Sequence, residues 1–90
     1  MEAAEDLFQQ VLALDRKLLG NDHPYVASTL RRLGQLRLRA GDAREAEEHY
    51  REALEIQRKN FPDDHYQIAI TKSFLGGAMI DQGQYENAQS

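Results

Sequence analysis

The sequence repeats itself with a period of 42 residues, and no other feature restricts the possible folds as strongly. When the 90-residue chain is shifted against itself by 42 positions, 13 of the 48 overlapping pairs are identical. The identical pairs include Leu12 with Leu54, Lys17 with Lys59, Asp22 with Asp64, His23 with His65, Leu33 with Leu75, Gly34 with Gly76 and Gly41 with Gly83. A period of this length predicts a repeat protein, in which each unit buries its apolar face against a neighbouring unit.

Each period contains two stretches of apolar residues at helical spacing. Val26, Leu30 and Leu33 mark the first stretch, and Tyr50 and Leu54 belong to the second. No segment alternates convincingly with a period of two, so we expect no strand and an all-α fold. The spacing predicts helices over about 2–19, 24–40, 43–60 and 66–82, with a further helix beginning near Tyr85.

Glycine and proline mark the boundaries between these helices. Gly41 and Gly83 are expected to end helices by adopting the left-handed conformation, with breaks at 40–42 and 82–84. The break between units falls at 20–24 and again at 62–66. Pro24 suits the first turn of a helix, and the adjacent Asp22, like Asp64 in the second copy, can cap free backbone N–H groups there.

Small residues occur where two helices of a unit would cross. Gly34 and Gly76 stand at matched positions on the first helix of each unit, and Ala46, Ala53 and Ala88 lie on the second. Glycine inside a helix costs about 1 kcal/mol relative to alanine. Two glycines at matched positions therefore indicate close packing of helices.

These residues together resemble the tetratricopeptide repeat family. The pattern consists of Leu33-Gly34, Gly41, Ala46, Tyr50, Ala53 and Leu54. The long period and the link over 20–27 resemble the kinesin light chain type of this repeat, although Arg31-Arg32 and Ser73-Phe74 replace the Asn pair usual in that type. The resemblance implies antiparallel helix hairpins stacked as a right-handed α-solenoid. It also implies binding of peptides or proteins on a concave face, without catalysis.

The register of the resemblance implies an array that is truncated at both ends. Residues 1–20 would be the second helix of a preceding repeat, 21–62 one complete repeat and 63–90 an incomplete one. Apolar residues on the end helices would then lack their usual partner helices, so we expect either an excised fragment or self-association. The residues concerned are Leu7, Phe8, Val11 and Leu12 on the opening helix, and Phe74, Leu75, Met79 and Ile80 on the last.

The candidate binding site lies on the first helix of each unit. In the family this helix lines the concave groove, and a helical wheel places five polar side chains of helix 24–40 opposite its apolar side. These five are Ser28, Arg31, Arg32, Gln35 and Arg39, and the matching positions of the next unit include Ile70, Ser73, Phe74, Gly77 and Asp81. Arginines beside an apolar patch suit an acidic segment with one large apolar anchor. The alternative is that the arginines only form a solvated face.

Other charged residues are expected to serve structure. Helix 43–60 alternates Glu with Arg and Lys at helical spacings, which is typical of an outward, solvated face. His23 and His65 lie one repeat apart and cannot converge on one metal ion, so we expect them to help start helices. The pairs Asn21-Asp22 and Asp63-Asp64 lack the glycine turn and distal Glu of a calcium loop, which leaves capping as their expected role.

Composition and motifs exclude several functions. A formal charge of −4 disfavours broad binding to the phosphate backbone of a nucleic acid. The absence of Cys excludes thiolate metal sites and cysteine nucleophiles. No catalytic or phosphate-binding motif is present, so we expect neither an enzyme nor a cofactor. The acidic start differs from a secretion signal, and no apolar run could span a bilayer, which favours a cytoplasmic protein without membrane attachment.

Two functions remain from the sequence. The first is a protein-interaction scaffold that holds a peptide or protein segment in the groove. The second is a structural spacer or oligomerisation module that joins copies through the exposed end helices.

Overall fold

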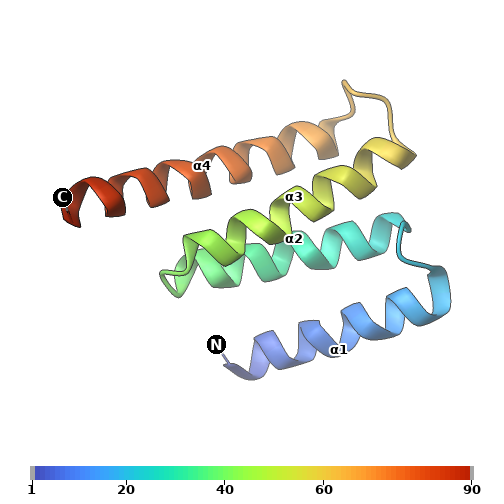
Figure 1. Cartoon of the computed structure of the whole chain (residues 1–90). Helices are drawn as coiled ribbons and strands as arrows, with labels where there is room; N and C mark the ends of the chain where they lie inside the picture. The colour runs from blue at the N-terminus through green and yellow to red at the C-terminus, as the bar shows by residue number, and fades with distance from the viewer. Residues whose placement is uncertain (1, 90) are drawn as a thin grey trace.

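Four antiparallel helices make up the fold. The computed structural model describes the backbone of residues 2–89 and the side chains of residues 5–83. The helices are α1 (Glu2–Leu19), α2 (Pro24–Arg39), α3 (Ala43–Asn60) and α4 (Tyr66–Gln89). Each helix runs opposite to the one before and packs beside it (Figure 1). No strand occurs in residues 2–89, so the prediction of an all-α fold of helix hairpins is confirmed.

Gly41 ends a helix in the left-handed conformation as predicted, and Gly20, which lies in the predicted break at 20–24, does the same. Gly20 follows α1 with φ of 91°, and Gly41 follows α2 with φ of 88°. Both values lie in the left-handed region, where a side chain would clash with the backbone and glycine is favoured. The predicted bounds of the first three helices are confirmed to within one residue.

Histidine caps the start of α2 and of α4, the helices that follow the breaks between units, whereas the sequence predicted that aspartate would cap them. Nδ1 of His23 accepts a hydrogen bond of 3.1 Å from the backbone N–H of Tyr25, and His65 does the same for Gln67 at 3.1 Å. The expectation that the two histidines help start helices is therefore confirmed. Asp22 instead contacts Lys59 at 3.2 Å, because it lies one residue too far from the helix to act as its cap.

The predicted helix break at 82–84 is wrong, because α4 continues through Gly83 to Gln89. The predicted new helix at Tyr85 is therefore part of α4. After Gly41, the carboxylate of Asp42 accepts a hydrogen bond from the backbone N–H of Glu45 at 3.2 Å and starts α3. The residue after Gly83 is glutamine, which is not among the favoured capping residues, so nothing there favours a new helix start. The side chain of Ala88 lies outside the described residues.

The apolar residues form two core clusters. The first core cluster joins α1, α2 and α3, and the second joins α3 to α4. The first contains Leu12, Val26, Ala27, Leu30, Leu33, Ala53 and Ile56, with Phe8 packed against it. The second contains Ala46, Tyr50 and Ala78, with Leu38, Phe74 and Leu75 packed against it. Burying a large apolar side chain stabilises the fold by about 1.5–3 kcal/mol, so the middle of the chain carries most of this stabilisation.

The two matched glycines have different surroundings. A Cβ atom on Gly34 would lie 2.6 Å from Cε1 of Tyr50, so only glycine fits between α2 and α3. The prediction of close packing is confirmed at Gly34. It is wrong at Gly76, where a Cβ atom would meet nothing within 4 Å. The reason is that α4 runs straight on through Gly83, so no further helix of the described chain crosses α4 at Gly76.

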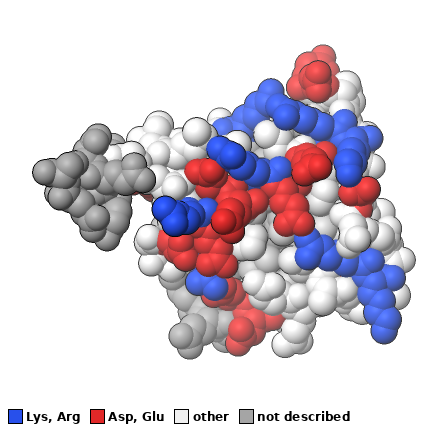
Figure 2. All heavy atoms as spheres, in the orientation of Figure 1, with Lys and Arg blue, Asp and Glu red and all other residues white. Residues whose placement is uncertain are grey.

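The outward side of α3 is a mixed charged surface, as predicted. Acidic and basic side chains alternate over the middle of the molecule, where α3 lies (Figures 1 and 2). Arg51 pairs with Glu47 one turn away, at 2.9 Å. Other pairs connect α3 to different parts of the chain. Arg16 of α1 contacts Glu52, and Lys59 contacts Asp22 in the link before α2.

One arginine of α2 reaches both neighbouring helices. The guanidinium of Arg37 contacts the carboxylate of Glu5 on α1 and lies 3.5 Å from that of Glu45 on α3. These pairs connect α1 and α3 through the helix between them. No helix in the described part of the chain is long and apolar enough to cross a bilayer.

Candidate functional site: the α2–α4 face

The predicted site residues lie on α2 and α4, on a surface that we call the α2–α4 face. It carries Ser28, Arg31, Arg32, Gln35 and Arg39 from α2, and Ile70, Ser73 and Phe74 from α4. Pro24 starts α2 and His23 caps it, so the arginines stand on a regular helix whose opposite side is fixed in the first core cluster. Arg32 and Arg39 are exposed, whereas Arg31 is half-buried.

Ser28 and Arg32 come together in a pocket between α1 and α2. The pocket has a volume of about 300 Å³ and is also lined by Phe8, Val11, Asp15, Tyr25 and Thr29. The apolar contribution of α1 to this pocket was not predicted, because a helical wheel of the first helix in each unit carries no information on its neighbours. Asp15 adds a carboxylate, which accepts a hydrogen bond from the hydroxyl of Thr29 at 3.5 Å.

Arg31 faces the other way, toward α4. Its guanidinium donates a hydrogen bond of 2.9 Å to the side-chain oxygen of Gln67 at the start of α4. This bond brings the N-terminal halves of α2 and α4 together. No described hydrogen bond or pocket connects Gln35 to the other predicted residues.

The predicted site residues of α4 differ in how exposed their side chains are. Ile70 and Ser73 are exposed, and Phe74 is half-buried. The ring of Phe74 stacks on Tyr50, with ring centroids 5.7 Å apart and an angle of 16° between the planes. Part of Phe74 is therefore already used in the second core cluster, and Ile70 offers the more accessible apolar surface.

Tyr50 lies beneath the α2–α4 face and is fully buried. Among the described residues its hydroxyl has no hydrogen-bond partner. Burial raises the pKa of Tyr50 above its ordinary value, and the positive charges of Arg31 and Arg39 partly oppose this shift. Both arginines are therefore near enough to act electrostatically on one phenol. From the sequence alone, Tyr50 is placed only in the apolar pattern of helix 43–60.

The arginines of the α2–α4 face lack acidic partners. Arg16, Arg37 and Arg51 each contact a carboxylate within 4 Å. None of Arg31, Arg32 and Arg39 does so among residues 5–83. The chain is acidic overall, with 15 Asp and Glu against 11 Lys and Arg, yet these three cations stand together on one helix.

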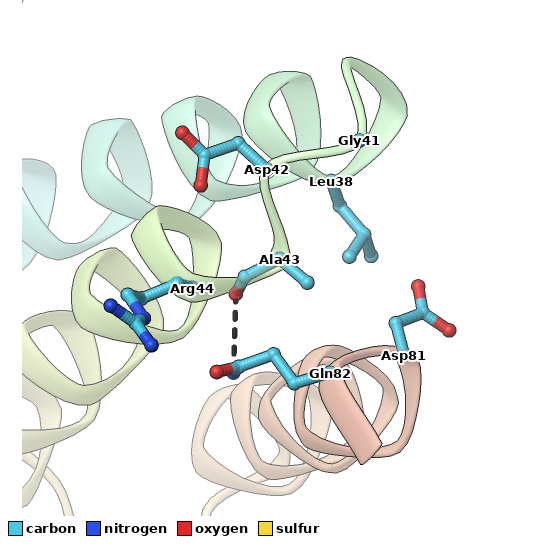
Figure 3. Close-up of a pocket in the computed structure, with 7 residues that line it drawn as sticks. All are labelled: Leu38, Gly41, Asp42, Ala43, Arg44, Asp81 and Gln82. Carbon is cyan, nitrogen blue, oxygen red and sulfur yellow. Dashed lines mark hydrogen bonds between the residues drawn. The ribbon is translucent and has the colours of Figure 1, made fainter. Parts of the chain in front are cut away.

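A second pocket lies where the turn between α2 and α3 meets α4. It has a volume of about 460 Å³ and is lined by Leu38, Gly41, Asp42, Ala43, Arg44, Asp81 and Gln82. Leu38 and Asp81 lie on one side of it, and Arg44 points to the opposite side (Figure 3). The side-chain amide of Gln82 on α4 donates a hydrogen bond of 3.5 Å to the carbonyl of Ala43 at the start of α3, so it connects these two helices at the pocket. The pocket combines one apolar wall with two carboxylates, those of Asp42 and Asp81, and one guanidinium, that of Arg44.

The histidines show no arrangement for metal binding. His23 and His65 cap two different helices and use Nδ1 for that purpose. Within the described part of the chain, no three His, Asp or Glu side chains are grouped so that they could hold an ion.

The repeated antiparallel hairpins define the class of this protein as a helical-repeat scaffold. Comparison with protein families gives a match to the tetratricopeptide repeat over residues 1–59, which span α1, α2 and all but the end of α3. The chain belongs to the tetratricopeptide repeat family. Repeats of this family generally mediate protein–protein interactions and are non-catalytic scaffolds. A search of curated proteins gives no match. The match does not test the kinesin light chain subtype, which stays a prediction.

Proposed function

We propose that this chain is a protein-interaction module that binds an acidic segment with an apolar anchor on the α2–α4 face. The observation that carries the proposal is the set of three arginines, Arg31, Arg32 and Arg39, without carboxylate partners. A guanidinium offers a planar fork of N–H donors that matches a carboxylate, and such charge-assisted bonds are stronger than neutral ones. Ile70 and the exposed part of Phe74 would contact the anchor.

Two pockets extend this face at its ends. The pocket that contains Ser28 and Arg32 has apolar walls from Phe8 and Val11. It suits an apolar side chain of the ligand that is next in sequence to an acidic residue bound by Arg32. The pocket beside Leu38 contains the carboxylates of Asp42 and Asp81 against the single guanidinium of Arg44, so it disfavours a further carboxylate. An acidic ligand would therefore place its negative charges along α2 and keep them away from the end of α4.

Binding of a labelled peptide tests the proposal. The peptide carries Asp and Glu residues around one Phe, and fluorescence anisotropy measures its affinity. Arg31→Glu and Arg39→Glu should each weaken binding at least about tenfold, because each removes a charge-assisted contact and adds a repulsive carboxylate. Arg58→Glu on α3 is the matched control, since Arg58 is exposed, makes no ion pair in the described residues and lies off this face.

A further variant separates the charge from the geometry. Gln67→Ala removes the hydrogen-bond partner of Arg31 and leaves every charge in place. The freed guanidinium should bind the peptide at least as tightly as in the unchanged chain. Equal affinity for the peptide in the Arg31→Glu, Arg39→Glu and Arg58→Glu variants would contradict the proposal.

Self-association through the end helices is a second proposed function. One observation favours it: Leu7, Leu14 and Leu18 of α1 are each more than half exposed, and Ile80 of α4 is 60% exposed. Of the end residues predicted to be uncovered, Leu12 is buried and Phe8, Phe74 and Leu75 are half-buried, because they face the interior. Leu7, Val11, Met79 and Ile80 are exposed as expected.

A further inference from the structure

An apolar stripe runs along the outer side of α1. Leu7, Val11, Leu14 and Leu18 follow one another at intervals of four, three and four residues, so they share one side of the helix. Their exposed fractions are 59%, 36%, 54% and 69%. We call these four residues the α1 stripe.

A second uncovered surface lies on α4. Ala69, Lys72, Met79 and Ile80 are exposed, and the space above Gly76 is open. These five positions fall within one sector of the helix at 100° per residue. We call them the α4 face. It lies on the last helix of the row, and the α1 stripe lies on the first (Figure 1).

The internal repeat shows what covers such surfaces. Val11 and Leu14 align with Ala53 and Ile56 of α3, which are buried in the first core cluster with Val26, Ala27 and Leu30 of α2. In the same way, Ala69, Gly76 and Ile80 of α4 align with Ala27, Gly34 and Leu38 of α2, which pack in the core clusters or against Tyr50 of α3. In sequence, α1 therefore corresponds to α3, and α4 to α2.

We propose that copies of this chain stack head to tail, with α1 of one copy packed on α4 of the next as α3 packs on α2. This inference rests on the self-association proposed above and specifies its partner and its register. The occupant of both surfaces is a second copy of the chain. The new contact continues the row of helices without changing its pattern.

The ring of Phe8 fits the open position at Gly76. Phe8 aligns with Tyr50, whose ring lies against Gly34. One side of Phe8 already packs on the first core cluster, which holds the ring in place. Phenylalanine also lacks the hydroxyl that is buried without a partner at Tyr50, so the copied contact buries no unpaired polar atom at this point.

A charge pair at the rim supports the same register. Lys59 of α3 contacts Asp22, before α2, at 3.2 Å. The aligned residues are Lys17 on α1 and Asp64 before α4, and both are identical to their counterparts. Lys17 and Asp64 are exposed, and neither forms an ion pair within residues 5–83. Head-to-tail stacking would bring them together.

Lys72 is the mismatch in this interface. It stands where Leu30 is buried in the first core cluster. Its aliphatic part can cover apolar surface while the ammonium reaches the rim, at a cost in affinity. Lys72→Leu should therefore strengthen association by roughly tenfold, since it restores the side chain of the inner interface. Lys72 is exposed, so the change should leave the fold of each copy intact.

Head-to-tail contacts use two different surfaces and leave one of each free, so assembly is open-ended. The average mass should rise with concentration beyond twice the monomer mass of 10.3 kDa. If the α1 stripe instead packed on the α1 stripe of another copy, the contact would be symmetric and growth would stop at a dimer. Sedimentation equilibrium distinguishes these outcomes.

Two blocked variants make the test decisive. Leu14→Glu blocks the α1 stripe, and Gly76→Gln fills the open position on the α4 face. Each variant alone should remain a monomer. An equimolar mixture should form a complex of twice the monomer mass and nothing larger, because only the free α4 face of the first can bind the free α1 stripe of the second.

Matched controls sit one residue away. Ala13→Glu adds the same charge at a position aligned with the exposed Glu55, and Gly77→Gln adds the same side chain beside Gly76. Both controls should associate like the unchanged chain. Circular dichroism of every variant confirms that the helices are retained.

Three results would overturn the inference. A chain that stays monomeric at all concentrations would overturn self-association as well as its register. Association that Gly76→Gln leaves unchanged, or a Gly76→Gln variant that still dimerises alone, would overturn the register and leave self-association standing. A mixture of the two blocked variants that stays monomeric while both fold would also overturn the head-to-tail contact.

Discussion

Gly34 and Gly76 stand at the same position of the repeat, yet only Gly34 is covered by another helix. The ring of Tyr50 fills the space above Gly34, whereas the space above Gly76 is open. The residue type and the local helix are the same at both sites. What differs is the neighbouring helix, so in this fold the contribution of a residue depends on the interface between units more than on the unit itself.

The largest expected difference lies between the two aromatic residues of the repeat. Tyr50→Ala should destabilise the fold by about 3–5 kcal/mol, because Tyr50 is fully buried between α2 and α4. Phe8→Ala should cost about half as much, since Phe8 is covered on one side only. Thermal melting followed by circular dichroism, at a dilution where the chain is monomeric, measures both. Equal losses would show that the inner aromatic residue on α3 and the outer one on α1 are packed alike.

Alanine at the two glycines should have opposite effects. Gly34→Ala should destabilise by roughly 1–2 kcal/mol, because the clash with Tyr50 outweighs the gain in helix propensity. Gly76→Ala should stabilise the monomer by about 0.5–1 kcal/mol, since its Cβ meets nothing. Urea unfolding of both variants tests the sign. Effects of the same sign at both sites would contradict the difference in packing.

The two histidine caps should behave alike. His23→Ala and His65→Ala each remove a hydrogen bond of 3.1 Å from a helix start and should each cost about 1 kcal/mol. Since one cap precedes the covered α2 and the other precedes α4, equal losses would show that capping is local. If His23→Ala lost several times more stability than His65→Ala, the contribution of a cap would depend on how well its helix is packed.

The smallest effect is expected from removal of the Tyr50 hydroxyl. Below pH about 10, Tyr50→Phe should change stability by less than about 1 kcal/mol, because a buried and unpaired hydroxyl contributes little. Burial raises the pKa of Tyr50, so the unfolded chain loses this proton at a lower pH than the folded protein does. The stability is therefore full below the unfolded pKa and falls as the pH rises through the folded pKa. Melting curves at alkaline pH should show a smaller loss in the Tyr50→Phe variant.

The sequence predicts the helices because their apolar spacing is local. It predicts the packing at Gly34 because the complete repeat contains Tyr50 on the helix that crosses there. It does not predict the continuation of α4, since glycine permits a helix to end without requiring it, and no capping residue such as Asp42 follows Gly83. The capping role of His23 over Asp22 depends on one residue of register, which periodicity does not resolve.

The site was predictable in part for the same reason. A helical wheel places Arg31, Arg32 and Arg39 on one side of α2. It carries no information on contacts between helices, so the bond from Arg31 to Gln67 and the stacking of Phe74 on Tyr50 emerge only from the packed structure.

Because of Arg37, the helix contacts within one copy and the proposed contact between copies should respond differently to dissolved ions. On α2 its guanidinium contacts carboxylates of both adjacent helices, whereas the aligned residue on α4 is Met79. Dissolved ions screen charge pairs, and sulfate in particular strengthens apolar contacts. Ammonium sulfate should therefore weaken the ion pairs of Arg37 within each copy and strengthen the apolar contact between copies. The salt concentration would then set the number of copies in an assembly.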